Sequence, residues 1–472
     1  MSDADLLIVG GGPAGMSAAL AAASRGIRCC IIDEAPELGG QIYRAPHPTA
    51  RQAAPQLIHT RGDELREQVA QHRDLIEVRS STMVWGVSDV SKVAIGREGH
   101  GSEFVHPRAM VIATGAYEYC PPFPGWTLPG VMTPGSAQIL TKTMNVQPGK
   151  RVLVAGTGPL LYVVASQLVQ KGVDVLAVLE ATRKMDWLRL PLVGLCAPEL
   201  LAEGLGYLRV LRAAGVPIHY GRVVTRAEGD GELQRVTHAS VNSDWVPDRD
   251  SEEQFEVDTL CVGYGLQPRN YLAQLGGCAI KFDETRGGWV PKRDKRMRTS
   301  QAFLYAAGDG AGIGGSRLAE LDGKIAGLTA ARDLGYISAV AMWMAQLPLR
   351  IKRARLTRVL NAIALITRLK SGLAELVEPE TIVCRCEEIK WREAKTAIEH
   401  GGHDFRTLKV MTRIGMGMCQ ARFCWPSMSR MIARQTDIAV ADVGPAHPRP
   451  PIRPVQLDVI ADETHATAKA SE

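Results

Sequence analysis

The apolar positions of the first 35 residues fall into two short runs with an alanine-rich segment between them. Residues 6–9 (LLIV) and 27–32 (IRCCII) each have the length and composition of a buried strand. The segment between them predicts a helix that reaches about Arg25, where Gly26 ends it. This order of strand, helix and strand predicts an α/β fold.

Similar apolar runs recur later in the chain. Residues 109–115 (AMVIATG) and 301–315 (QAFLYAAGDGAGIGG) each contain an apolar strand that ends in glycine, and residues 150–180 form a complete second strand–helix–strand unit. Residues 336–349 are also apolar. That run is shorter than the roughly 18 residues of a membrane span and contains polar groups, so we expect a buried helix there.

Glycines mark the turn between the first strand and the first helix. Gly10, Gly12 and Gly15 form G-x-G-x-x-G, and Asp33 closes the second strand. In this motif the first glycine permits the tight turn, the second lets the backbone approach a pyrophosphate, and the third lets the helix pack on the strand. The helix N-terminus offers N–H groups to phosphates, and Asp33 is placed to accept ribose hydroxyls. These features predict a dinucleotide site, without deciding between FAD and NAD.

The second unit departs from this fingerprint. It keeps Gly156 and Gly158, but Leu161 stands at the third glycine position. In the first unit the acid expected to bind the ribose, Asp33, comes 23 residues after the first glycine. The same distance from Gly156 leads to Leu179, and Glu180 comes one residue later. We expect the leucine to hold the helix away from the strand, and side-chain alternation to direct Glu180 to the opposite face. The unit should keep the fold with a degraded nicotinamide fingerprint, and an adenine nucleotide bound there as a structural ligand stays open.

Composition limits the classes of function. The chain has 472 residues, of which 46% are hydrophobic and 22% charged, so we expect two or three domains with a full core. A net charge of +5 is too small to suggest a nucleic-acid partner, and any membrane contact should be at most peripheral. The N-terminus lacks the pattern of a secretory signal. We therefore expect a cytoplasmic location, free or at the inner face of the membrane, and reduced thiols.

Four of the ten cysteines stand near the end of the chain. Cys384 and Cys386 form C-x-C, and Cys419 and Cys424 form C-x4-C. In a reducing compartment such clusters indicate metal or redox chemistry rather than disulfides. Structural zinc usually uses C-x2-C pairs, which this spacing fits poorly. Zinc, an iron–sulfur cluster and no metal all stay open at this point.

The spacing resembles that of the [2Fe–2S] domain of bacterioferritin-associated ferredoxin. The resemblance implies a [2Fe–2S] cluster on the four cysteine thiolates. Arg385, Arg413 and Arg422 stand beside the ligands and would offset the negative charge of such a cluster. Gly415 and Gly417 would let backbone N–H groups approach the sulfurs, which helps to set the potential.

The order of the nucleotide-type segments resembles the glutathione and thioredoxin reductases, in which a split FAD domain encloses an inserted second Rossmann domain. The resemblance implies FAD packed against Gly115, with Asp309 on its ribityl chain and the helix near Gly315 aimed at its pyrimidine ring. The redox C-x-x-C pair of those reductases is missing from this sequence. The cofactor-binding residues implied are Gly10, Gly12, Pro13, Ala14, Gly15, Asp33, Glu34, Gly40, Gln41, Ala113, Thr114, Gly115, Gly308 and Asp309.

Segments such as 121–133 (PPFPGWTLPGVMT), 258–269 (DTLCVGYGLQPR) and 382–388 (IVCRCEE) resemble one family over nearly the full length. It comprises the alpha subunits of opine oxidases and of proline or hydroxyproline dehydrogenases and the B subunit of hydrogen cyanide synthase. Tyr119 stands where that family has arginine. The implied fold is α/β, with two Rossmann-like domains, the second inserted in the first, and a small C-terminal [2Fe–2S] domain. The expected parts are FAD domain (1–120 and 263–335), degenerate NAD(P)-type domain (121–262), helical linker (336–379), [2Fe–2S] domain (380–437) and Pro-rich tail (438–472).

The resemblance also implies a function. The chain would be an electron-transfer subunit, paired with a flavoprotein related to D-amino-acid dehydrogenases, with or without a small third subunit. The partner would oxidise a C–N bond of an opine, glycine or proline-type substrate to an imine, and electrons would leave to a respiratory acceptor. No catalytic residue can be named in this chain. A stand-alone NAD(P)H-dependent reductase of a ferredoxin-like partner and a regulatory flavoprotein that senses redox or iron are the alternatives.

Overall fold

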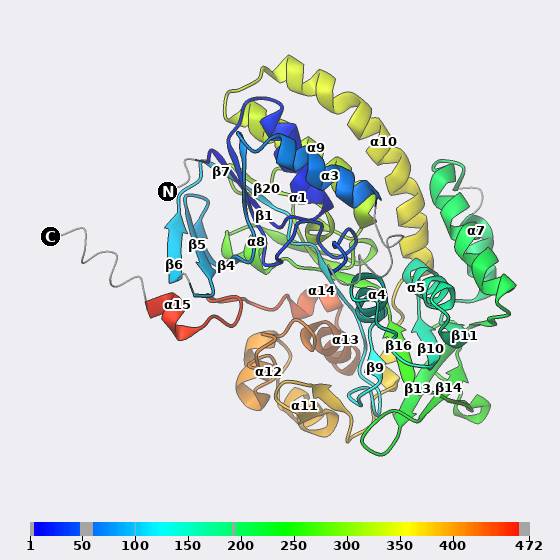
Figure 1. Cartoon of the computed structure of the whole chain (residues 1–472). Coiled ribbons are helices and arrows are strands. Elements are labelled where there is room, and N and C mark those ends of the chain that lie inside the picture. Colours follow the sequence, from blue (N-terminus) through cyan, green and yellow to red (C-terminus); the bar gives the residue numbers. More distant parts are fainter. Residues whose placement is uncertain (1–3, 48–59, 100, 191–193, 462–472) are drawn as a thin grey trace.

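The computed structural model describes residues 4–47, 60–99, 101–190 and 194–461 (Figure 1). Its first sheet is parallel, with strand order β20-β7-β1-β2-β3. The strands are β1 (Leu6–Val9), β2 (Cys29–Ile32), β3 (Ile76–Arg79), β7 (Ala109–Ile112) and β20 (Leu304–Ala306). Because β20 lies beside β7, two segments far apart in the sequence complete one sheet, as expected for a split domain.

Helices cover one face of this sheet and a small antiparallel sheet covers the other. On the first face lie α1 (Pro13–Ala23), α3 (Thr60–Gln71) and α9 (Gly315–Asp333), whose apolar side chains share one core with Leu6 and Ile8. On the second face, Leu7 and Val9 pack into another core. That face is covered by β4 (Met83–Asp89), β5 (Lys92–Arg97), β6 (Gly101–Val105) and α8 (Tyr271–Leu275). The hairpin of β18 (Ile280–Asp283) and β19 (Gly288–Pro291) adjoins this part.

The second Rossmann unit repeats this arrangement. Its parallel sheet has the order β12-β11-β10-β16-β9, with one face packed on helices and the other on the antiparallel sheet β13-β14-β15. The helices are α4 (Pro134–Thr143), α5 (Pro159–Gln170) and α7 (Pro198–Ala213). The strands are β9 (Val131–Met132), β10 (Arg151–Gly156), β11 (Asp174–Glu180), β12 (Ile218–Tyr220), β13 (Arg222–Glu228), β14 (Arg235–Ser240), β15 (Glu253–Glu256) and β16 (Thr259–Gly263). The predicted fold class, with one Rossmann unit inserted in another, is confirmed.

The two units are joined by a pair of crossing strands. β8 (Ala116–Glu118) leaves the first unit, β17 (Leu266–Pro268) returns to it, and the two pair antiparallel. The segments on either side of this pair therefore enter and leave the inserted unit at one place.

A bulge in β11 changes the register of the inserted sheet. The pairing of β10 with β11 shifts between Val152 and Leu153, which leaves Leu176 without a partner. As a result, Glu180 lies directly opposite Gly156. The carboxylate is thereby brought to the mouth of the glycine loop.

This register corrects the count made from the sequence. In the first sheet Val9 pairs with Ile32, which places Asp33 one step further, beside Gly10. Glu180 has the same relation to its own glycine, so the expectation that Leu179 takes the place of the ribose acid was wrong. The physical reason is the single extra residue in the strand, which also reverses the expected direction of the glutamate.

Leu161 does not hold its helix away from the strand as we expected. Gly158 has φ 101°, whereas the corresponding Gly12 has φ −74°, so the second glycine loop follows a different path into its helix. Leu161 is buried with Val152 and Val154 in the core between α5 and the sheet. The altered loop therefore seats the leucine inside the core, and the helix is not left standing off the strand.

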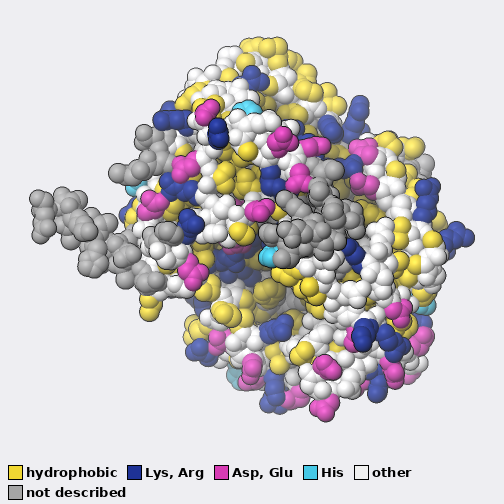
Figure 2. Space-filling model, in the orientation of Figure 1, with side chains coloured by type: hydrophobic (Ala, Val, Ile, Leu, Met, Phe, Trp, Pro, Cys, Tyr) yellow, Lys and Arg dark blue, Asp and Glu magenta, His cyan; other side chains and the backbone are white. Residues whose placement is uncertain are grey.

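Residues 336–349 begin a long helix that is less buried than we expected. α10 (Ala339–Ile366) runs along the outside of the first unit (Figure 1) and packs through Leu356 and Val359 against α9. Its opposite side exposes a row of apolar side chains, Val340, Trp343, Met344, Leu347 and Ile351. Apolar atoms also gather at the top of the molecule in Figure 2. The expected helix is confirmed, but a neighbour covers only one side of it. Among the described residues, no helix is long and apolar enough to cross a membrane.

The C-terminal part has a core of its own. It comprises β21 (Ile382–Cys384), β22 (Ile389–Lys390), α11 (Trp391–Glu399), α12 (Phe405–Thr412), α13 (Trp425–Thr436) and α14 (Val440–Val443). Ser427 of this part lies 3.3 Å, hydroxyl to hydroxyl, from Tyr119, whose side chain belongs to the core of the inserted unit. The chain after Gly444 then crosses back to the first unit, where α15 (Leu457–Ala461) lies beside β5 and β6.

Candidate functional site

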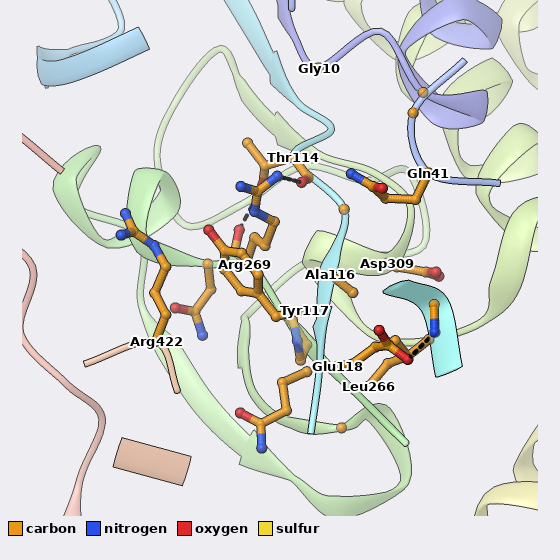
Figure 3. A pocket seen from close by; sticks show the side chains of 18 of the residues that line it. Gly10, Gln41, Thr114, Ala116, Tyr117, Glu118, Leu266, Arg269, Asp309 and Arg422 are labelled. Atoms are coloured by element: carbon orange, nitrogen blue, oxygen red, sulfur yellow. Dashed lines mark hydrogen bonds between the residues drawn. The ribbon is translucent and has the colours of Figure 1, made fainter. Parts of the chain in front are cut away.

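One cavity of about 1280 Å³ connects the first Rossmann unit with the C-terminal part (Figure 3). Most of the residues singled out in the sequence line it: Gly10, Gly12, Pro13, Ala14, Asp33, Glu34, Gly40, Gln41, Ala113, Thr114, Gly115, Asp309 and all four of Cys384, Cys386, Cys419 and Cys424. Gly15 and Gly308 are not among its lining residues; Gly15 packs against the backbone of Gly10, and Gly308 packs against Ala14 and Ala319. The two predicted sites are therefore parts of one continuous space.

The glycines divide into two kinds. A Cβ on Gly10 would come 2.4 Å from the Ala113 carbonyl oxygen, and one on Gly15 would come 1.8 Å from the Gly10 carbonyl oxygen, so both are required by the fold itself. A Cβ on Gly12 would meet only the Gly40 Cα at 3.6 Å, and one on Gly115 would meet nothing within 4 Å. These two glycines face open cavity. This is the arrangement that lets a pyrophosphate and an aromatic ring system approach the backbone, and it fits FAD.

The acid that ends β2 is held at the mouth of the glycine loop. Asp33 accepts hydrogen bonds from the Gly11 N–H at 2.5 Å and the Ala35 N–H at 2.7 Å. The next residue, Glu34, forms ion pairs with Arg269 at 3.2 Å and with Arg453 of the C-terminal tail. The tail thus contributes a cation to this end of the cavity, a contribution that no spacing in the sequence indicates.

Two further carboxyl groups line the cavity. Asp309 accepts hydrogen bonds from the N–H groups of Gly314 and Gly315 at 2.9 Å each, and burial raises its pKa. Glu118 accepts hydrogen bonds from the Gly135 N–H at 2.8 Å and from the Thr133 hydroxyl, and burial raises its pKa as well. Sequence reasoning missed Glu118, because its position becomes significant only when β8 passes the start of α4.

The four cysteine sulfurs are neighbours in space. The Cys424 thiol donates hydrogen bonds to Cys384 and Cys419, and Cys386 donates to Cys419. These bonds lower the pKa of Cys384 to about 6 and that of Cys419 to about 5, and they raise the pKa of Cys424 well above its usual value. Two of the four thiols are therefore prepared to be thiolates, the form that binds metal.

Backbone N–H groups also point at the sulfurs. Those of Gly415 and Glu387 are directed at Cys384, and those of Ala421 and Phe423 at Cys419. A Cβ on Gly417 would come 2.2 Å from the Cys386 Cβ, so that glycine is required as well.

The four thiols are the donor type that iron–sulfur clusters use. Among the described residues, no group of three or more His, Cys, Asp and Glu side chains is arranged to hold a single metal ion. Four cysteines on one cavity wall, with backbone N–H donors near Cys384 and Cys419, fit the ligands of a [2Fe–2S] cluster.

A group of cations and aromatic rings lies between the two ends of the cavity. The Arg269 Cζ stands 4.3 Å from the ring centroid of Tyr117, and the Arg422 Cζ stands 5.9 Å from it (Figure 3). Of the three arginines expected to offset cluster charge, Arg385 and Arg422 line the cavity. The third, Arg413, pairs with Glu387 at 2.8 Å.

The second glycine loop has its own acid already engaged. Glu180 is fully buried and accepts hydrogen bonds from the Thr157 hydroxyl at 2.7 Å and the Tyr162 hydroxyl at 3.2 Å. It also accepts from the N–H groups of Gly158 at 3.2 Å and Thr182 at 3.1 Å. The position equivalent to Asp33 is thus occupied by a carboxylate whose oxygens serve the protein itself.

Comparison with known proteins agrees with this architecture. Residues 4–335 match the model of the pyridine nucleotide-disulphide oxidoreductases, and residues 378–464 match that of the sarcosine oxidase A3 domain. Hydrogen cyanide synthase subunit HcnB of Pseudomonas protegens is 35% identical over 95% of this chain and 96% of its own. An opine oxidase subunit of Rhizobium meliloti is 35% identical over 99% of this chain and 88% of its own.

Among solved structures, L-proline dehydrogenase of P. horikoshii has a similar fold. Its chain superposes with a TM-score of 0.69, covers 97% of this chain and 79% of its own, and is 21% identical. The family is one of flavoproteins, which implies FAD in the cavity, and the residues described above fit it. This chain therefore belongs to the pyridine nucleotide-disulphide oxidoreductase family of flavin-dependent oxidoreductases, and it is similar over nearly its full length to subunits of hydrogen cyanide synthase and opine oxidase.

Proposed function

We propose that this chain is the FAD- and [2Fe–2S]-containing electron-transfer subunit of a heteromeric amine or amino-acid dehydrogenase. The observation that carries the proposal is the single cavity lined at one end by Gly12, Asp33 and Gly115 and at the other by the four cysteines. Two redox groups held in one continuous space are suited to pass electrons between them. The relatives named as subunits of opine oxidase and hydrogen cyanide synthase support the assignment to a complex.

Separate groups of residues in this chain would bind FAD and the cluster. Gly12 and the N-terminus of α1 receive the pyrophosphate, Asp33 holds the ribose, and Asp309 with Gly115 positions the flavin end. The cluster would be held by Cys384, Cys386, Cys419 and Cys424. FAD supplies two-electron redox chemistry and the cluster one-electron chemistry.

The partner carries the carbon chemistry. We propose a flavoprotein subunit related to D-amino-acid dehydrogenases, with or without a small third subunit, that oxidises an opine, glycine or proline-type amine to an imine. A respiratory acceptor takes the electrons in the end. The expected site is cytoplasmic, with at most peripheral contact at the inner face of the membrane.

Co-expression tests this proposal. The chain purified alone should show little or no amine dehydrogenase activity with an artificial electron acceptor, and the co-purified complex should show it. A Cys424→Ser complex, assembled at the same stoichiometry, should lose transfer to the acceptor while still reducing the partner's flavin. Rapid turnover of an opine or amino acid by the chain alone would show a substrate site of its own and contradict the proposal.

A second function is favoured by one observation. Glu180 lies opposite Gly156 as a ribose acid should, which would suit a stand-alone NAD(P)H-dependent reductase. Against it stands the engagement of the same carboxylate by four donors of the protein. Anaerobic mixing with NADH and NADPH separates the two functions, because only the stand-alone reductase would have its flavin reduced by either nucleotide.

A further inference from the structure

Tyr117 connects the two ends of the cavity. It lies in β8, two residues after Gly115, and its ring centroid is 6.3 Å from that of Phe423. Phe423 directly precedes Cys424. A single ring-to-ring contact thus joins the backbone that faces the flavin site to the backbone that carries a cluster cysteine.

The two arginines beside Tyr117 are fixed in place from opposite sides. Arg269 is bonded to Glu34 and lies within 3.5 Å of the Thr114 carbonyl oxygen. Arg422 donates a hydrogen bond to the Cys419 carbonyl oxygen at 3.1 Å and another to that of Ile452. In Figure 3 the Arg269 side chain lies close to Tyr117 and Arg422 lies farther from it, in keeping with their distances of 4.3 Å and 5.9 Å from the ring centroid. The partly buried ring of Tyr117 therefore lies in the cavity wall with Arg269, Arg422 and Phe423 as neighbours.

Arg269 has a carboxylate partner, whereas Arg422 donates its hydrogen bonds to carbonyl oxygens. Arg269 is compensated by Glu34. In the part of the chain that the structure describes, no carboxylate lies within ion-pair distance of Arg422, whose hydrogen bonds go to carbonyl oxygens. Arg422 therefore keeps an uncompensated positive charge three residues from Cys419 and two from Cys424.

We propose that Tyr117, held between Arg269 and Arg422 and against Phe423, is the bridge through which single electrons pass between the flavin and the cluster, and that Arg422 favours the electron on the cluster. In each transfer one group is oxidised by one electron and the other is reduced by one, and no bond forms or breaks in this chain. The proposal rests on the proposed function, because it requires both redox groups.

The rate of electron transfer depends on what fills the space between the flavin and the cluster. Electron tunnelling slows steeply as the space between donor and acceptor is widened or filled with loosely packed atoms. Removing the Tyr117 ring would leave water or empty space where Arg269, Arg422 and Phe423 now make contact. Phenylalanine at this position would keep the ring and its contacts, since no hydrogen bond of the Tyr117 hydroxyl contributes to the arrangement described.

The first test measures the transfer step itself. The flavin of the anaerobic, fully loaded chain is reduced by a light pulse with a deazaflavin donor, and the cluster absorbance is followed. Tyr117→Leu should slow the intramolecular transfer by about tenfold or more, equal to about 1.4 kcal/mol of barrier per tenfold, whereas Tyr117→Phe should leave the rate near that of the wild type. Equal rates for Tyr117→Leu and the wild type would overturn the proposal.

Phe423 provides an independent variant, because its side chain is half exposed and its replacement should not disturb the fold. Phe423→Leu should slow the same step. If Tyr117 and Phe423 act through one contact, the double variant should be little slower than the slower single variant. Full multiplication of the two effects would show that the ring contact is not the bridge.

The charge of Arg422 is tested by redox titration followed by electron paramagnetic resonance. Arg422→Gln should move the midpoint potential of the cluster to a lower value and leave that of the flavin little changed. An unchanged cluster potential would remove Arg422 from the proposal. Flavin and iron contents are measured first for every variant: a wild-type chain without iron defeats the proposed function, while a loaded chain with an unaffected transfer rate defeats the bridge alone.

Discussion

Glu180 and Gly156 lie opposite each other in the parallel ladder of the inserted Rossmann unit, and the Glu180 carboxylate is directed back into the glycine loop. A ribose diol could bind there only after at least one of the present donors had been displaced. The aromatic ring of Tyr162, whose hydroxyl is one of those donors, is itself held edge-on by Trp187 at 6.3 Å. The unit keeps the position of the nucleotide acid and uses it internally.

We therefore predict that NADH and NADPH do not reduce the flavin at a useful rate. Losing one hydrogen bond to a charged group costs about 1.5–3 kcal/mol, or roughly ten- to a hundredfold in affinity. Anaerobic stopped-flow mixing of the loaded chain with each nucleotide measures this directly. Rapid bleaching of the flavin band by either nucleotide would favour the reductase function over the electron-transfer subunit.

How much of this site is visible in the sequence depends on the range of the contacts involved. Gly10, Gly12 and Asp33 are separated by fixed steps within one strand–helix–strand unit, so their spacing alone identifies them. Glu180 obeys the same rule, but the one-residue bulge at Leu176 breaks the count. A bulge leaves no reliable mark in an apolar run, because the residues on either side of it are also buried.

Contacts between distant segments explain the other misses. Glu118 and Tyr117 gain their significance from α4 and from the loop before Cys424, and neither neighbour is close to them in sequence. The same holds for Arg453, which reaches Glu34 from the C-terminal tail. The four cysteines are recognisable because their own spacing carries the signal. The expected domain boundaries and individual cofactor contacts remain predictions.

The two sides of α10 provide a matched test of packing. Leu356 is buried against α9, and Leu356→Ala should lower the free energy of unfolding by about 2–5 kcal/mol. Leu347 lies on the exposed side of the same helix, and Leu347→Ala should change it by no more than about 0.5 kcal/mol. Denaturant unfolding of both variants checks the prediction. Equal losses would mean that the outer side of the helix is covered in solution.

His238 should make the stability of the chain fall in mild acid. It is buried in β14, stacks on Phe255 at 5.2 Å, and has no hydrogen-bond partner for either ring nitrogen in the described part of the chain. Burial, followed by the charge of Arg222, lowers its pKa from 6.5 to about 4. Because the unfolded chain binds a proton that the folded chain does not, the contribution is fully present above pH 6.5 and is lost as the pH falls toward 4.

The expected loss at pH 5 is about 2 kcal/mol relative to pH 7. His238→Leu should remove this dependence, so its thermal midpoint should change less between the two pH values than that of the wild type. His400→Gln, at an exposed position, serves as the control and should behave as the wild type does. An unchanged pH dependence in His238→Leu would show that other groups cause it.

Two glycine variants should separate the two cofactors. A Cβ on Gly12 would meet no protein atom closer than 3.6 Å, so Gly12→Val should fold, retain the cluster and lose FAD. A side chain on Gly417 would collide with Cys386, so Gly417→Ala should lose the cluster and retain FAD. Flavin absorbance and iron content, measured on each purified variant, give the result. Full flavin in Gly12→Val would mean that the pyrophosphate lies elsewhere.

An iron–sulfur cluster beside the flavin can be detected by spectroscopy and metal analysis of one anaerobic sample. The chain is purified without air, reduced with dithionite and examined by electron paramagnetic resonance, with iron, acid-labile sulfide and zinc determined on the same sample. The account predicts iron and sulfide in equal amounts and the spectrum of a reduced [2Fe–2S] cluster, which Cys384→Ser abolishes while the flavin stays bound. Zinc in place of iron, with no such spectrum, would contradict it.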